Sequence, residues 1–253
     1  MIYIVSHKPV NLPDFSGYKL LQVGSCDENF PGFLRDNTGD NIARKNANYC
    51  ELTAMYWIWR NVREDHKGLV HYRRFFGRRL FGNLGDVLSY EALMDTLKGH
   101  DILIPRPVVY HTSAKEQLLM ESCTDDTFEK LTAVFYGIHP DCMADYEAFF
   151  RNNKASQYNM LFCSAELFDR YSAWLFPVLF QLEVLVDLSG ANDYQKRLFG
   201  FLSERLLNVW IRHNQLDAVF APVVHTEYTK LDYLTYLRRD ITNGVRFRIL
   251  NGR

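Results

Sequence analysis

The sequence predicts an α/β fold, a sheet flanked by helices, within a single domain that spans residues 1–253. Short apolar runs of strand length alternate along the chain with longer runs of helical periodicity. Apolar residues make up 47% of the composition, which is enough to bury a full core. No internal repeat, low-complexity segment or linker divides the chain, so one domain is favoured over two.

Two short strands, at residues 2–5 and 19–23, are expected first, and an irregular polar loop over 24–47 follows them. A loop this long is uncommon unless it is functional. A helix is expected next, with Asn48 as its N-cap and Glu51 completing a capping box. Apolar residues then recur with helical spacing, at Leu52, Met55, Tyr56 and Trp59.

The remaining elements follow from the same signals. Strands are expected at residues 68–75, 101–105, 159–163 and 218–224. Helices are expected at 89–98, 124–135, 140–151 and 193–213, and the first of these stops at Gly99. One more helix is expected to begin after the N-cap Ser164 and to kink at Pro177. The tail from Glu227 has a mixed pattern that predicts neither a helix nor a strand.

The charge balance argues against a nucleic-acid partner. Lys and Arg number 29 and Asp and Glu number 30, so the basic excess typical of nucleic-acid binders is missing. The five cysteines form no Cys-x-x-Cys pair, which indicates a reducing, cytoplasmic location without a disulfide framework. The apolar N-terminus lacks a basic region and is expected to be a strand rather than a signal peptide. No stretch is long and apolar enough to span a membrane.

The segment His71-Tyr72-Arg73-Arg74 is the first candidate site. An apolar strand delivers these four polar groups to its carboxyl end, where open α/β sheets bind ligands. Arginine can hold a diphosphate there by paired, charge-assisted hydrogen bonds. The alternative is a solvated basic turn after a strand.

Two further groups are expected to bind the same ligand as this segment. Ser6 and His7 follow the first strand and are placed near a base or ribose. Asp36, Asn37, Asp40 and Asn41 offer partners for sugar hydroxyls within the polar loop. The alternative for this loop is ordinary surface turn chemistry.

Polar residues of the second half are further candidates for a functional site. Asp126, Asp193 and Glu204 are the catalytic candidates, and Asn159 is the acceptor-binding candidate. Simpler roles remain for Asn159 as a turn residue, for Asp193 as a helix cap and for Glu204 as one half of a solvated pair with Arg205. A general base must be a carboxylate or histidine within reach of the acceptor hydroxyl, and the sequence does not select one.

Several cofactor motifs are absent. The chain has no Asp-x-Asp, the motif that often holds Mn²⁺ or Mg²⁺ in sugar-nucleotide enzymes, so no metal ligand is assigned, although distant residues could still form a site. It also lacks Gly-x-Gly-x-x-Gly and the phosphate-binding P-loop. Dehydrogenase and P-loop functions therefore lose support.

Three segments together resemble a known family: residues 36–42 (DNTGDNI), 48–54 (NYCELTA) and 68–74 (GLVHYRR). The resemblance continues through 101–105, 158–160, 193–195 and 199–205. It points to bacterial glycosyltransferases of capsular and O-antigen synthesis with a His-Tyr-Arg-Arg signature, long described only as a domain of unknown function.

The resemblance implies a GT-A-like fold with a mixed central sheet, a nucleotide-binding half of about residues 1–110 and an acceptor half of about 111–253. It implies a nucleotide-sugar donor, such as a UDP-hexose, and a lipid-linked or oligosaccharide acceptor. The alternative is a non-catalytic protein that binds a sugar nucleotide or a glycan on the same fold.

A lipid-linked acceptor leads to the hypothesis of peripheral contact with the inner face of the cell membrane. Arg78 and Arg79, with neighbouring aromatic and apolar side chains (Phe75, Phe76, Leu80 and Phe81), are the proposed contact edge. The alternative is a partly buried hairpin.

Overall fold

The computed structural model describes residues 1–25 and 28–251, and a mixed sheet of nine strands forms its centre. The strand order is β10-β6-β9-β4-β1-β2-β3. These strands are β1 (Ile2–Ser6), β2 (Tyr18–Gln22), β3 (Leu34–Arg35), β4 (His66–His71), β6 (Ile102–Pro105), β9 (Leu161–Ser164) and β10 (Ala218–Ala221). β9 runs antiparallel to both of its neighbours, whereas β1 is parallel to β2 and β4. The predicted mixed sheet flanked by helices is therefore confirmed.

Two short strands extend this sheet beyond β4, and two more pair separately. β5 (Arg74–Phe76) turns back from β4 and pairs with β11 (Val223–His225). β7 (Val108–Val109) pairs with β8 (Lys154–Ala155).

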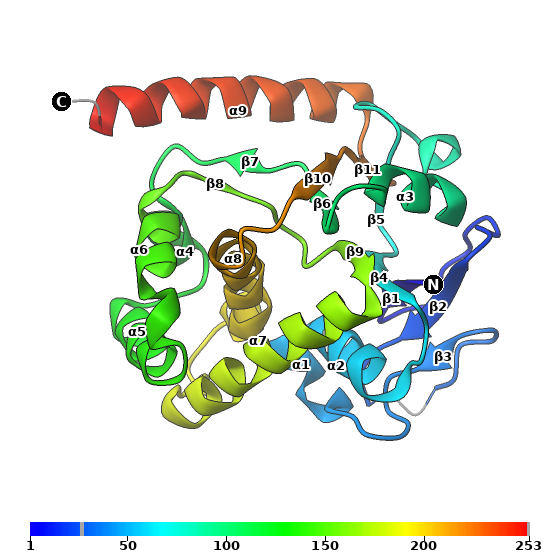
Figure 1. The fold of residues 1–253 in the computed structure, drawn as a ribbon, viewed down its shortest axis with the longest axis horizontal. Helices are drawn as coiled ribbons and strands as arrows, with labels where there is room; N and C mark the ends of the chain where they lie inside the picture. The colour runs from blue at the N-terminus through cyan, green and yellow to red at the C-terminus, as the bar shows by residue number, and fades with distance from the viewer. Residues whose placement is uncertain (26–27, 252–253) are drawn as a thin grey trace.

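Helices cover both faces of the sheet (Figure 1). Along β1, Tyr3 and Val5 point into one hydrophobic core and Ile2 and Ile4 into the other, as the alternation of a strand requires. The larger core is built with α2 (Leu52–Asn61), α4 (Ala114–Glu121), α5 (Asp125–Ile138), α6 (Met143–Arg151), α7 (Ala165–Leu185) and α8 (Leu198–His213). The smaller core lies under α3 (Tyr90–Leu97) and β5. The short α1 (Asn46–Tyr49) packs against α8, and α9 (Lys230–Asn251) lies along the edge of the molecule.

Several predicted caps are confirmed because the signals that specify them are local. Ser164 accepts a hydrogen bond from the Leu167 amide at 3.2 Å and starts α7. Gly99 has φ +84 just after α3, a left-handed conformation that glycine adopts without strain.

Other local predictions are wrong. Asn48 does not cap a helix: it lies inside α1, and its side-chain amide donates to the Lys196 carbonyl at 2.9 Å. Glu51, expected inside the first turn, is itself the N-cap of α2, without a side-chain capping bond. Asp193 starts no helix, because α8 begins at Leu198 and the turn before it is closed by Asn192.

The strand expected at 68–75 is two strands with a turn at Tyr72-Arg73, and that expected at 218–224 is divided at Pro222. α4 and α9 were not predicted. The proposed membrane edge at Arg78 and Arg79 is wrong for Phe75 and Phe76, which are fully buried, whereas Phe81 is half-buried. The alternative of a partly buried hairpin describes this segment.

Cys26 lies outside the described residues, and the other four cysteines are free thiols. Across the described part of the chain, no helix combines the length and the apolar character needed to cross a bilayer.

Candidate functional site

A cleft of about 370 Å³ opens at the carboxyl ends of β1 and β4. The two strands are neighbours and parallel, with Val5 opposite His71. From β1 the chain first moves to β2 on one side and later returns to β4 on the other. The strand order therefore reverses at this point, and such switch points are where open α/β sheets bind ligands.

Three arginines line the cleft, and few acidic groups compensate them. The Arg74 guanidinium lies 4.5 Å from the centre of the Tyr158 ring, and its Nε is buried without a hydrogen-bond partner in the described structure. Arg73 has one ion-pair partner, the exposed Glu227 at 3.2 Å. Arg197 donates from Nε to the Cys50 sulfur at 3.3 Å. The guanidinium groups are thus held in place with donors to spare, an arrangement suited to a ligand with several negative charges.

A buried acidic group lies at the floor of the same cleft. The Glu51 carboxylate accepts a hydrogen bond from the Asn159 side-chain amide at 2.7 Å and lies 3.8 Å from His71 Nε2. His71 Nε2 lies 2.5 Å from the Tyr158 carbonyl oxygen. A carbonyl can only accept, so Nε2 carries the proton of a neutral imidazole. Burial lowers the pKa of His71, and Glu51 opposes that effect only in part.

The segment Tyr158-Asn159 is strained, and the strain lies next to the cleft. Tyr158 has φ 76 and Asn159 has φ 50, which places two consecutive non-glycine residues in the left-handed region. Each such residue costs on the order of 1–3 kcal/mol and persists only where its surroundings impose it. The conformation presents the Tyr158 carbonyl to His71 and the Asn159 amide to Glu51.

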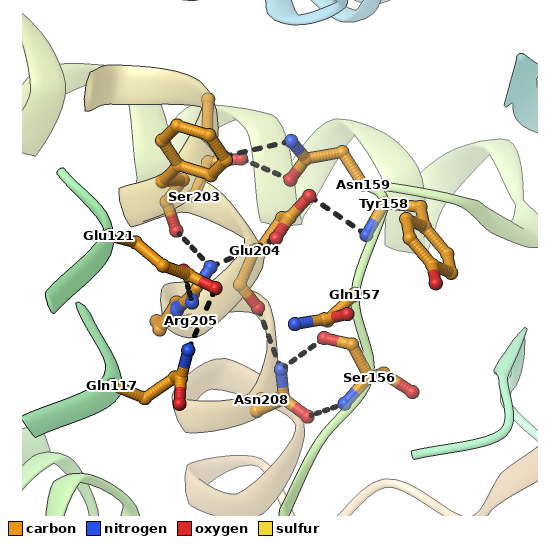
Figure 2. Close-up of polar contacts among 12 residues, drawn as sticks. Gln117, Glu121, Ser156, Gln157, Tyr158, Asn159, Ser203, Glu204, Arg205 and Asn208 are labelled. Carbon is orange, nitrogen blue, oxygen red and sulfur yellow. Dashed lines mark hydrogen bonds and ion pairs between the residues drawn. The ribbon is translucent and has the colours of Figure 1, made fainter. Parts of the chain in front are cut away.

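A buried polar network imposes this conformation from α8 (Figure 2). Glu204 accepts from the Tyr158 amide at 2.9 Å, and Ser203 donates to the Asn159 side chain. Asn208 forms hydrogen bonds with both the amide and the carbonyl of Ser156. One helix therefore holds the backbone of the strained segment from residue 156 to 159.

Arg205 is the centre of that network and is fully buried. Its guanidinium donates to Glu204 at 2.9 Å and to Glu121, whose other oxygen accepts from Gln117 at 3.0 Å. Burial nevertheless raises the pKa of Glu204 to about 7. A buried cation flanked by two carboxylates fixes geometry more than it adds stability.

Residues 1–215 match the profile of the family described as domain of unknown function DUF4422. The chain belongs to the DUF4422 family.

Among solved structures, this DUF4422 chain is similar to the apo structure of WbbM, a bifunctional glycosyltransferase, with a TM-score of 0.81 and 28% sequence identity. The match covers 90% of this chain and 45% of the WbbM chain, so the DUF4422 chain spans less than half the length of that structure. No curated protein sequence matches it. This likeness and the mixed central sheet together support the expected GT-A-like fold.

The cleft of the DUF4422 domain brings together most residues predicted to bind the donor. Ser6 and His7 come from the end of β1, and His71, Tyr72, Arg73 and Arg74 come from β4 and the turn into β5. Ser6 is buried and its hydroxyl donates to the Lys8 carbonyl at 2.6 Å. The Tyr72 ring has Lys8 and Arg73 over it, each 5.1 Å from its centre. Asp193 also lines the cleft, with its side chain fully exposed.

The polar loop divides into separate environments. Asn37 and Asn41 line a second hollow of about 610 Å³, which adjoins the cleft at Lys45-Asn46. Asp36 is fully buried, and one carboxylate oxygen accepts from the Gly24 amide at 3.0 Å. Asp40 is exposed and pairs with Arg60 at 2.6 Å, so it ties the loop to α2.

The other predicted residues do not line the cleft. Asp126 lies on the first turn of α5 and pairs with Lys130 at 2.6 Å. Glu204 accepts a hydrogen bond from the Tyr158 amide, and the Asn159 side-chain amide donates to the cleft residue Glu51. Both oxygens of Glu204 already accept hydrogen bonds, one from the Tyr158 amide and one from Arg205.

Sequence reasoning missed four cleft residues whose side chains carry polar groups or sulfur: Asn46, Cys50, Glu51 and Arg197. Cys50 and Glu51 lie in one of the segments that carry the family resemblance, and that was their only signal. Arg197 precedes α8 and carries no local signal at all. The described residues hold one group of three potential metal ligands, Asp141, Cys142 and His213, and none of the three lines the cleft.

Proposed function

We propose that this protein is a glycosyltransferase that moves a hexose from a nucleotide sugar, such as a UDP-sugar, to a lipid-linked or oligosaccharide acceptor in capsule or O-antigen synthesis. The observation that carries the proposal is the cleft at the switch point, with Arg73, Arg74 and Arg197 around one hollow. Membership of DUF4422 and the likeness to a glycosyltransferase structure support the same activity.

In this proposal the arginines bind the donor diphosphate. The leaving group of glycosyl transfer is a nucleoside diphosphate whose negative charge grows as the glycosidic bond breaks. Cations held there before the reaction stabilise the transition state more than the ground state. Arg74 fits this role best, because its Nε is buried and has no described partner within the protein.

The cleft also limits the choice of general base. Glu51 and Asp193 are the carboxylates that line it, and His7 and His71 are the imidazoles. His71 already donates its Nε2 proton to a carbonyl, and Glu51 faces it across 3.8 Å. The general base that takes the acceptor proton is proposed to be Glu51 or Asp193. Ser6 and His7 are proposed to lie near the nucleobase and ribose of the donor. Asp126 is kept as an acceptor-side candidate only if the acceptor reaches α5.

A screen of nucleotide sugars tests the proposal. A ligand at 100 times its Kd stabilises the folded state by about 2.7 kcal/mol, which a thermal melt resolves easily. Each stabilising donor is then incubated with acceptor oligosaccharides, and release of nucleoside diphosphate is measured. Binding with turnover is the expected result. Binding without turnover would favour the non-catalytic alternative, and no binding of any nucleotide sugar would overturn the proposal.

A further inference from the structure

α9 is fixed to the body of the protein by one face only. The Asn243 side-chain amide donates to the Val109 carbonyl at 2.8 Å, and the Tyr233 hydroxyl accepts from the His225 amide at 2.8 Å. Gly244 faces the Val109 side chain. These contacts lie along β7 and β11, and the helix passes over them at the edge of the molecule (Figure 1).

The opposite face of α9 is apolar and exposed. Its five large apolar side chains are 53–71% exposed: Leu231, Leu234, Ile241, Val245 and Ile249. They follow one another at intervals of three, seven, four and four residues, which places them on one side of an α-helix. None of these five side chains belongs to either hydrophobic core.

The charges on the same helix are mostly positive. Arg238 falls within the apolar stripe, and Arg239, Arg246 and Arg248 lie beside it. None of the four belongs to an ion pair between described residues. The two acidic residues of the helix already accept hydrogen bonds: Asp232 accepts from Thr229, and Asp240 accepts from the Val109 amide on the inner face.

We infer that this outer face of α9 binds an anionic membrane surface. Helices with an apolar stripe and basic flanks lie in the plane of the interface, with the stripe among the acyl chains and the basic groups among the lipid phosphates. A second copy of the chain fits less well. It would bring eight arginines together, and the two acidic residues of the helix, Asp232 and Asp240, already accept hydrogen bonds.

α9 lies beyond residues 1–215, the part that the family profile matches. The surface is therefore a feature of this chain in addition to the shared domain. The inference rests on the proposed function in one respect: membrane binding would hold the enzyme where a lipid-linked acceptor is found. Lipid binding itself requires no transfer, so the two can fail separately.

Sedimentation with vesicles tests the inference on the full chain. Vesicles of phosphatidylcholine with phosphatidylglycerol are compared with phosphatidylcholine alone, at low and high salt. Wild-type protein is expected to bind the anionic vesicles, and less so at high salt. Arg239→Glu with Arg246→Glu, and separately Ile241→Glu with Val245→Glu, are each expected to reduce binding by about tenfold or more.

A matched control has the same change in charge elsewhere. Arg63 and Lys98 are exposed and form no ion pair with another described residue, so Arg63→Glu with Lys98→Glu is expected to bind like wild type. Melting temperatures confirm that each variant is folded. Failure of wild type to bind anionic vesicles, or an equal loss in the control, would overturn the inference. So would a dimer in light scattering that only the Ile241→Glu, Val245→Glu variant abolishes, because the occupant would then be a second copy.

Discussion

The Arg74 guanidinium lies over the ring of Tyr158, 4.5 Å from its centre, and Tyr158 is held in the left-handed region with φ 76. A strained residue therefore supports the cation that faces the cleft. The strain is maintained by Glu204, which accepts the Tyr158 amide proton at 2.9 Å. The candidate donor site thus depends on Glu204, which does not itself line the cleft.

Arg74→Lys is expected to keep the melting temperature and to lose nucleotide affinity and transfer activity. Lysine retains the charge but lacks the planar fork that grips two phosphate oxygens. Loss of one preorganised donor costs on the order of 10²–10³ in kcat. Arg73→Lys is expected to act in the same direction, and Arg78→Lys, which is exposed and outside the cleft, is the control. Normal binding and turnover in both cleft variants would place the diphosphate elsewhere.

Glu51→Gln is expected to lower kcat strongly while nucleoside-diphosphate binding persists. Glutamine keeps the size of the side chain and can still accept the Asn159 hydrogen bond, but it cannot take a proton. Asp193→Asn tests the other cleft carboxylate, and Asp126→Asn, on the first turn of α5, tests a carboxylate outside it. Single-turnover measurements separate binding from chemistry. If Asp126→Asn alone abolished transfer, the acceptor would have to reach α5.

Arg205→Met is expected to destabilise the protein by roughly 3–5 kcal/mol, because it leaves the mostly buried Glu204 carboxylate and the half-buried Glu121 carboxylate without their cation. Arg212→Met on the same helix removes an exposed pair with Asp145 and is expected to cost about 1 kcal/mol or less. Chemical denaturation measures both. Equal losses would show that the Arg205 network does not hold the fold.

Asp36 is expected to make stability fall as the pH rises. Burial raises its pKa from an ordinary value of 3.8 to about 6. Between these values the unfolded chain has lost the proton that the folded chain still holds, so rising pH favours unfolding. The shift corresponds to roughly 3 kcal/mol, fully lost above the folded-state pKa.

The measurement is the free energy of unfolding at a series of pH values from 4 to 7. In Asp36→Asn this part of the pH dependence should vanish, because the amide does not titrate. Asp40→Asn changes an exposed carboxylate of the same loop and should keep the wild-type slope. Identical slopes in wild type and Asp36→Asn would show that Asp36 does not titrate in this range.

The sequence alone determined the α/β class, the helix starts at Ser89, Thr124 and Ser164, and the basic end of β4. These features depend on neighbours a few residues apart: Ser164 starts α7 through its own hydroxyl, and the apolar run before His71 specifies a buried strand. The cleft residues Ser6, His71, Arg73 and Arg74, which we propose bind the donor, were predicted because they follow strands, and strand ends are local features. Local signals failed at Asn48, whose amide bonds to a carbonyl 148 residues away.

Only the tertiary structure decided which polar groups meet in the cleft. Arg197 reaches Cys50 because α8 packs against α1. Nothing in the spacing of these residues indicates the contact, because packing of the core sets it over 147 positions. The same holds for α9, whose exposed stripe is defined only once its other face is seen to pack on β7.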